Sequence, residues 1–217
     1  MPMDTDARAA ILNSIRSSLH AQADAAAIVA EYAAIPRVYK CASTLEGPAL
    51  LDRFAQRLTE YDAQVHRASA GKISEEIARI LTGRGRKEIA IPDGLPAEWL
   101  PDGFHFQNAT QFDDYQLDKT DGVLTGCTVA IAETGSIVLQ NAAAQGPRML
   151  SLVPDYHLCV VFAGQVVETV PGAFARLDAT STLPTTFISG PSATADIEMT
   201  RIQGVHGPRF LDVLLVV

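Results

Sequence analysis

Two short segments place small and hydroxyl-bearing residues directly after apolar runs that are typical of β-strands. The first segment, 133–136, follows the run 129–132, and the second, 189–198, follows the run 187–188. Hydroxyl groups and the backbone N–H groups of glycine-containing turns bind carboxylates and phosphates. Because ligands bind at the carboxyl ends of strands in open α/β sheets, we expect the two segments to meet at one rim and form a single anion-binding cleft. The candidate binding residues in the two segments are Thr134, Gly135, Ser136, Ser189, Gly190, Pro191, Ser192, Thr194, Asp196 and Glu198.

Three further side chains could act on an anion bound in this cleft. Arg148 has a planar guanidinium that can bind a carboxylate or phosphate through two parallel hydrogen bonds. A histidine exchanges a proton readily near neutral pH, so His206, which lies between two glycines, could take the proton of a ligand hydroxyl. Glu133 could act as a carboxylate nucleophile. The structural alternatives are a surface ion pair for Arg148, a hydrogen-bonding loop residue for His206 and an ordinary hairpin turn at Glu133.

The two acidic residues of the second segment depend on its backbone conformation. In an extended chain Asp196 and Glu198 face the same side, whereas in a helix they diverge. Carboxylates beside an anion site would bind a sugar hydroxyl, a positive group or a Lys or Arg of a partner. The structural alternative is a helix N-cap followed by solvated acids.

Length and composition limit the protein to a few broad classes. The chain has 217 residues, 47% of them hydrophobic and 19% charged, which is enough to bury the core of one domain. Its 17 Lys and Arg against 25 Asp and Glu give a net charge of −8, so it lacks the basic surface of a general nucleic-acid-binding protein. No apolar run reaches the roughly 20 residues that cross a bilayer, and the acidic start is unlike a secretory signal. We therefore expect a cytoplasmic protein without a membrane span.

The cysteines and histidines do not form a motif for a metal ion or a cluster. Cys41, Cys127 and Cys159 have no C-x-x-C spacing, whereas a cubane iron–sulfur cluster usually needs four thiolates. The histidines include no H-x-x-x-H pair, so a zinc site is not expected. The sequence also lacks a P-loop, a G-x-S-x-G elbow and an N-terminal G-x-G-x-x-G fingerprint. We expect this chain itself to bind no metal and no cofactor.

The apolar periodicity divides the chain into an N-terminal helical arm, residues 1–35, and an α/β domain, residues 36–217. In the arm, the apolar residues between Ile11 and Leu19 make one narrow stripe on a helix, and Pro36 ends the segment. We expect the arm to pack on the body or on a second copy of the chain, which would make the protein a homo-oligomer.

Within the domain, segments with helical and strand periodicity alternate, which is typical of a parallel sheet. Residues 92–122 have weak periodicity and are expected to form a long loop over one edge of the sheet, held to the body by Trp99. The expected helices cover 50–58, 73–81 and 170–177, and the expected strands cover 63–67, 89–91, 129–132, 137–139, 158–162, 187–188 and 210–217.

Four longer motifs in the second half of the chain occur in one order. They are E-T-G-S-I-V-L at 133–139, S-L-V-P at 151–154, S-G-P-S-A-T-A-D-I-E at 189–198 and G-V-H-G-P at 204–208. In order and spacing they resemble the lactate-utilisation protein C family (LutC/YkgG, the LUD domain), and the amphipathic arm extends the resemblance over nearly the whole chain. Many relatives have Asp where this chain has Glu133, so the resemblance does not fix a positional role for that carboxylate.

The resemblance implies a fold like that of the NagB/RpiA/CoA-transferase group, which is a Rossmann-like, mostly parallel sheet with helices on both faces. It also implies a role in bacterial oxidation of L-lactate to pyruvate, together with two iron–sulfur partner proteins. This chain lacks cluster-type cysteines, so the clusters would lie in the partners.

Three functions are compatible with these features. The first is a substrate-binding or accessory subunit of a lactate-oxidising assembly, in which Arg148 or the amides of 190–192 hold the carboxylate and His206 takes the hydroxyl proton. The second is a stand-alone acyl-, CoA- or nucleotide-handling enzyme with Glu133 as its nucleophile, which only fold analogy supports. The third is a non-catalytic assembly or regulatory protein that docks partners through its acidic surface and residues 1–30.

Overall fold

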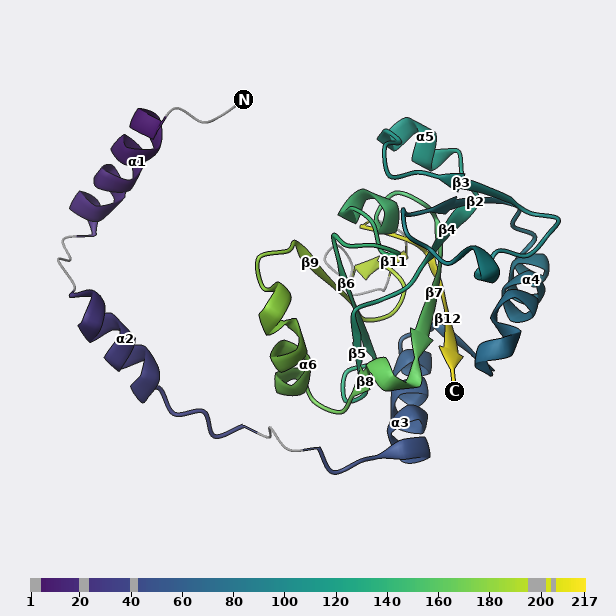
Figure 1. The fold of residues 1–217 in the computed structure, drawn as a ribbon, viewed down its shortest axis with the longest axis horizontal. Coiled ribbons are helices and arrows are strands. Elements are labelled where there is room, and N and C mark those ends of the chain that lie inside the picture. Colours follow the sequence, from purple (N-terminus) through teal and green to yellow (C-terminus); the bar gives the residue numbers. More distant parts are fainter. Residues whose placement is uncertain (1–4, 20–23, 40–42, 195–201, 204–205) are drawn as a thin grey trace. The chain divides into compact units, whose positions relative to one another are not determined.

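The chain divides into two compact units, Met1–Tyr39 and Lys40–Val217 (Figure 1). The computed structural model describes residues 5–19, 24–39, 43–194, 202–203 and 206–217. The division lies a few residues after the end of the predicted arm. None of the described helices is long and apolar enough to cross a membrane.

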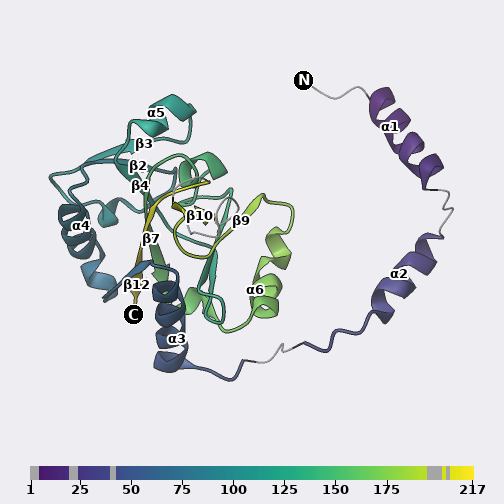
Figure 2. The same cartoon turned by 180° about the vertical axis from the view of Figure 1, so that it is seen from behind.

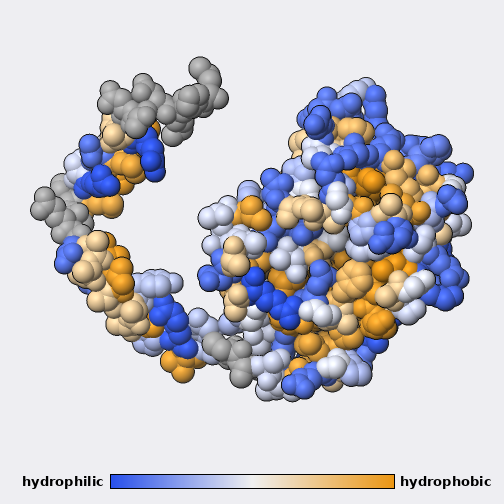
Figure 3. Space-filling model, viewed as in Figure 1, coloured by the Kyte–Doolittle hydropathy of each residue, from blue (hydrophilic) through white to orange (hydrophobic). Residues whose placement is uncertain are grey.

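The first unit consists of two helices, α1 (Thr5–Ser18) and α2 (Ala25–Ala34), where the sequence predicts one. Asp24 begins α2 because its carboxylate accepts a hydrogen bond from the backbone N–H of Ala26. Both helices expose apolar side chains, which Figure 3 shows among polar ones. The exposed apolar residues of the two helices are Ile11, Leu12, Ile15, Ile28, Val29 and Tyr32.

The second unit is built on a six-stranded, fully parallel sheet, which confirms the predicted fold class. The strand order is β1-β12-β7-β4-β2-β3. The two longest strands, β12 and β7, are neighbours inside the sheet and pair from Phe210 opposite Tyr156 to Val216 opposite Phe162. The six strands are β1 (Gln64–Ala68), β2 (Glu88–Ile91), β3 (His105–Asn108), β4 (Gly122–Thr125), β7 (Tyr156–Phe162) and β12 (Phe210–Val216).

A second sheet of four strands, in the order β8-β5-β6-β9, was not predicted. Its centre is the predicted hairpin, since β5 and β6 pair antiparallel, with Val129 opposite Val138. The sequence identifies these strands but not their separation from the parallel sheet. The four strands are β5 (Val129–Ile131), β6 (Ser136–Gln140), β8 (Val166–Val167) and β9 (Thr185–Ile188); a small antiparallel pair, β10 (Ala193–Thr194) and β11 (Ile202–Gln203), follows.

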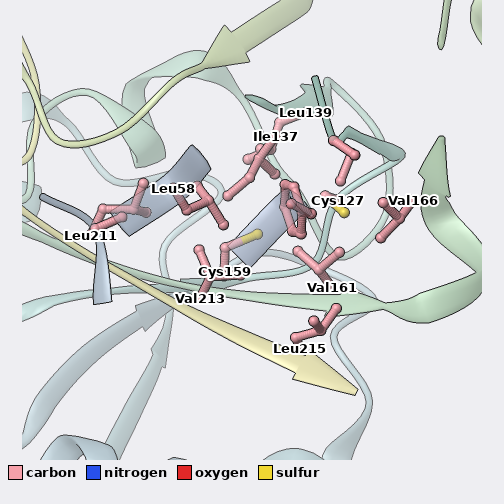
Figure 4. Close-up of a cluster of buried hydrophobic side chains, with 14 residues drawn as sticks. Leu58, Cys127, Ile137, Leu139, Cys159, Val161, Val166, Leu211, Val213 and Leu215 are labelled. Atoms are coloured by element: carbon pink, nitrogen blue, oxygen red, sulfur yellow. The ribbon is translucent and has the colours of Figure 1, made fainter. Parts of the chain in front are cut away.

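Alternate side chains of each strand point to opposite faces of the sheet, so the second unit is built in layers (Figures 1 and 2). On one face of the large sheet, α4 (Ile73–Arg84) packs on Leu158, Val160 and neighbouring strand residues. On the other face, α3 (Gly47–Glu60) and the small sheet enclose Cys159 and Val161, as Figure 4 shows. The outer face of the small sheet is covered by α6 (Val170–Leu177), which packs on its strands β5 and β6. The layer order is therefore α4, large sheet, small sheet, α6, with helices on both faces of the large sheet.

The segment 92–122 is more regular than the predicted loop. It contains the edge strand β3, which pairs parallel with β2, and a short helix, α5 (Asp114–Asp118). Most residues of β3 are exposed or half-buried, so the strand carries little of the apolar alternation by which strands are predicted. Trp99 is buried in the core beneath α4, which confirms that it holds the segment to the body.

A buried ion pair fixes α4 to the neighbouring strands β12 and β7. Asp212 of β12 is fully buried and accepts two hydrogen bonds from Arg84, at 2.9 and 2.6 Å, and one from the hydroxyl of Tyr156, at 2.9 Å. Burial alone would raise the pKa of Asp212, but its contacts with His66, Arg84 and Tyr156 outweigh burial and lower it. The carboxylate is thus charged and satisfied where β7 and β12 begin.

Two glycines bring the loops after β5 and β9 against the carboxyl end of α3. Gly135 has φ +60°, and a Cβ there would lie 2.8 Å from the backbone carbonyl carbon of Arg57. Gly190 has φ +87°, and a Cβ there would lie 2.6 Å from the Cβ of Tyr61. Both positions therefore need glycine for conformation and for space.

We expect Gly190→Ala to destabilise the protein by roughly 1–3 kcal/mol, because the added methyl group meets Tyr61 in a strained backbone conformation. Gly83→Ala is the matched control, since Gly83 lies inside α4 with nothing within 4 Å of the added atom. That variant should be stabilised by up to about 1 kcal/mol. Urea unfolding measures both, and equal stability of the two variants would contradict the proposed contact.

Candidate functional site

A cavity of about 160 Å³ opens at the amino ends of β7 and β12 and at the carboxyl end of β9. It also borders the 3₁₀ turn Arg148–Ser151, which precedes β7. The sequence predicts a site at the carboxyl ends of strands. This is correct for β9 of the small sheet, but the strands of the large sheet border the cavity with their amino ends. The polar side chains that line it are Arg148, Ser151, His157, Ser189, Ser192 and His206.

The cavity brings together the first four residues of the second predicted segment with Arg148 and His206. Residues 189–192 line it, and so do 206–208. The hydroxyl of Ser192 accepts a hydrogen bond from the backbone N–H of His206 at 3.1 Å, and the N–H of Ser192 donates to the carbonyl of Pro208 at 2.8 Å. Asp196, Glu198 and the side chain of Thr194 lie outside the described residues, so their predicted roles stay predictions.

The first predicted segment touches the second but does not line the described part of the cavity. Ser136 and Ser189 are hydrogen-bonded through their hydroxyls at 2.6 Å, and Thr134 bonds Ser136 at 2.7 Å. The two segments therefore meet, as expected. Glu133 is exposed on the turn between β5 and β6, and its catalytic role stays a prediction. Gly135 packs on α3 and supports the turn.

Arg148 supplies positive charge to the cavity. Its Nη1 donates to the carbonyl oxygen of Ser151 at 2.9 Å and to the hydroxyl of the same residue at 3.1 Å, which orients the guanidinium. Partial burial lowers the pKa of Arg148 from its usual value, but an arginine remains a cation at neutral pH. Among the described residues, no carboxylate forms an ion pair with it, and no acidic side chain lines the cavity. The site therefore favours an anion.

His157 is, with Ser151, one of two polar residues of the site that sequence reasoning missed. Its side chain lies on the face of β7 that also carries Cys159, and only 1% of the residue is exposed. Its Nε2 is hydrogen-bonded to the hydroxyl of Thr125 at 2.8 Å, whereas Nδ1 is buried without a partner among the described residues. Burial, together with the charge of Arg148, lowers the pKa of His157 to about 4, so the ring is neutral at pH 7. The one feature of the sequence that could have indicated His157 is its position directly before the apolar run 158–162.

The size of the cavity restricts what it holds. A cavity of about 160 Å³ has room for several water molecules or one small organic ligand. No three His, Cys, Asp or Glu side chains within the described ranges are grouped so that they could hold a metal ion. The geometry therefore fits a small organic anion held by a cation, hydroxyls and neutral imidazole.

Comparison with known proteins identifies the family. The family model described as the LUD domain matches residues 51–216, which is most of the chain. The chain belongs to the LUD domain family. It is 42% identical over 181 residues to a lactate utilization protein C of Deinococcus radiodurans, covering 82% of this chain and 84% of that protein. It is 39% identical over 156 residues to the protein YkgG of Escherichia coli, covering 64% of this chain and 67% of the relative.

A solved structure supports the LUD fold directly. The crystal structure of a DUF162 family protein from Deinococcus radiodurans superposes with a TM-score of 0.70 at 36% identity, over 80% of this chain and 99% of that one. The family resemblance and the α/β architecture predicted from the sequence are both confirmed.

The buried neutral His157 predicts a specific loss of stability in acid. An unfolded histidine binds a proton near pH 6.5, whereas the folded His157 does so only near pH 4, so stability falls as the pH drops between these values. From pH 7 to pH 4 the wild type should lose about 3 kcal/mol more unfolding free energy than His157→Gln. Urea titrations at both pH values measure the difference, and equal losses in the two proteins would show that the ring is not buried as neutral imidazole.

Proposed function

We propose that this LUD-domain protein serves lactate utilisation by binding a small monocarboxylate in the cavity beside Arg148. Several relatives carry the name lactate utilization protein C, and one of them matches most of the chain. The observation that carries the proposal is the guanidinium of Arg148, which lines a cavity of suitable size without an anionic partner among the described residues. L-Lactate has one carboxylate and six non-hydrogen atoms, which fit this cation and this volume.

The proposed role is that of a substrate-binding or accessory subunit that works with iron–sulfur proteins. Lactate oxidation releases two electrons, which need an acceptor, and in this proposal the clusters that accept them lie in partner proteins. Cys127 and Cys159, the cysteines that the structure describes, are buried free thiols in the apolar core. The chain would therefore hold the substrate while a partner accepts the electrons.

The enzyme that handles acyl groups or nucleotides is the weaker candidate. Its nucleophile would be Glu133, which is exposed on a turn and does not line the described part of the cavity. Ligands of that class are also large relative to a cavity of about 160 Å³.

The growth phenotype of cavity variants tests the proposed function. In a strain that lacks the chromosomal copy, Arg148→Ala combined with His206→Ala should abolish growth on L-lactate but not on glucose, because the carboxylate site is lost. The control combines Arg67→Ala with His105→Gln, which changes the same residue types at exposed positions away from the cavity. The Arg67–Asp52 ion pair is exposed, so its loss should cost at most about 1 kcal/mol. Wild-type growth of the cavity variant at equal protein level would refute the proposal.

The partner assignment is tested with the first unit of the chain. Tagged wild-type protein should capture proteins that contain iron and acid-labile sulfide. Ile28→Asp combined with Tyr32→Asp should reduce this capture at least tenfold, because both side chains are apolar and exposed on α2. The exposed substitution Glu31→Gln on the same helix is the control. Capture that is unchanged in the Asp variant would exclude this helix as the docking element.

A further inference from the structure

We propose that His157 recognises the oxygen at the 2-position of a small 2-hydroxy or 2-oxo monocarboxylate whose carboxylate is bound by Arg148. The inference deepens the proposed function and relies on it for the choice of ligands. It assigns to His157 the contact that the sequence assigns to His206. Four features of the site support it: an unpartnered buried nitrogen, a neighbouring cation, a reversible hydrogen bond behind the ring, and the small volume.

The first feature is the unpartnered Nδ1 of His157. Buried polar atoms in folded proteins nearly always have a hydrogen-bond partner, because leaving one without a partner costs free energy. Here the ring lines the cavity, its Nε2 is already bonded to Thr125, and Nδ1 has no hydrogen-bond partner in the part of the chain that the structure describes. Nδ1 itself has almost no accessible surface, so we infer that a polar atom of a ligand in the cavity reaches and satisfies it through a small movement of the ring or of the residues around it.

The second feature is the position of Arg148 beside the ring. The positive charge of Arg148 is close enough to contribute to the lowered pKa of His157. Nη1 of Arg148 is held by Ser151, which leaves the rest of the guanidinium for a ligand. In a 2-hydroxy or 2-oxo acid the second oxygen sits on the carbon next to the carboxylate, so neighbouring groups can bind both ends.

The third feature is the hydrogen bond between Thr125 and Nε2, in which either partner can donate. When Nε2–H donates to the threonine hydroxyl, Nδ1 carries a lone pair that accepts from the hydroxyl of a 2-hydroxy acid. When the threonine hydroxyl donates to Nε2, Nδ1–H donates to the carbonyl oxygen of a 2-oxo acid. One neutral ring can therefore hold both forms, as long as its tautomer follows the ligand.

The fourth feature is that charge and size exclude other acids. A neutral ring offers no charge to a second carboxylate, and Arg148 is the arginine that lines the described cavity. The cavity of about 160 Å³ is also small, which favours a ligand with few non-hydrogen atoms. We therefore expect monocarboxylates of two or three carbons and no binding of dicarboxylates.

Calorimetric titration of the full-length wild type with L-lactate, pyruvate and propionate tests the inference. Propionate has the same chain length and charge but lacks the 2-oxygen, so it should bind at least tenfold more weakly than the other two acids. His157→Phe should reduce lactate and pyruvate affinity at least tenfold, to the level of propionate, and change propionate affinity less than threefold. His105→Gln, an exposed substitution on β3, should leave all three affinities unchanged.

A second variant keeps the test valid if His157→Phe does not fold. Thr125→Val keeps the shape of the side chain and the histidine but removes the partner of Nε2, and should weaken lactate and pyruvate three- to tenfold without affecting propionate. If the wild type binds all three acids equally, or binds none of them, the inference is overturned even if the growth phenotype supports the proposed function. If the wild type selects lactate and pyruvate through His157 but cavity variants grow normally, the inference stands and the proposed function fails.

Discussion

The packing of two glycine loops on the carboxyl end of α3 is the constraint on which the site depends. Gly135 and Gly190 both touch the backbone or Cβ of that helix end, where no other residue has room. Their contact lets the hydroxyls of Ser136 and Ser189 meet at 2.6 Å. This joins the turn of the small sheet to the loop that lines the cavity, and the cavity in turn depends on how the small sheet sits on the large one.

The ionisable groups on the two faces of β7 and β12 are stabilised in opposite ways. On the α4 face, Asp212 is buried but bonded to Arg84 and Tyr156, so its charge is balanced by a cation and hydrogen bonds. On the other face, His157 avoids the cost of a buried charge by staying neutral, and Arg148 keeps a charge that no described carboxylate balances. On this second face a cavity, a cation without an ion-pair partner among the described residues and an unpartnered imidazole nitrogen lie together, and this combination separates a binding site from a structural network.

The sequence predicts what local periodicity encodes. The helices α3, α4 and α6 and the strands β7 and β12 follow from apolar stripes and runs, and the family follows from long motifs. The small sheet could not be predicted, because the same hairpin sequence suits either sheet. The glycine and hydroxyl cluster at 189–192 was predicted from the sequence and lines the cavity. His157 was missed because a single polar residue beside an apolar run has no distinctive spacing. The proposed role of His157 depends on its burial and on the lack of a described partner for Nδ1, and both result from tertiary packing.

The central claim is that a ligand of the cavity completes the hydrogen bonding of His157. Imidazole ¹⁵N NMR of the full-length protein at pH 7 measures this directly, with pyruvate and L-lactate added in turn. The account predicts a neutral ring in all states, a shift of the Nδ1 resonance of His157 with either acid, and opposite tautomers in the two complexes. Unchanged His157 resonances at ligand saturation would contradict it.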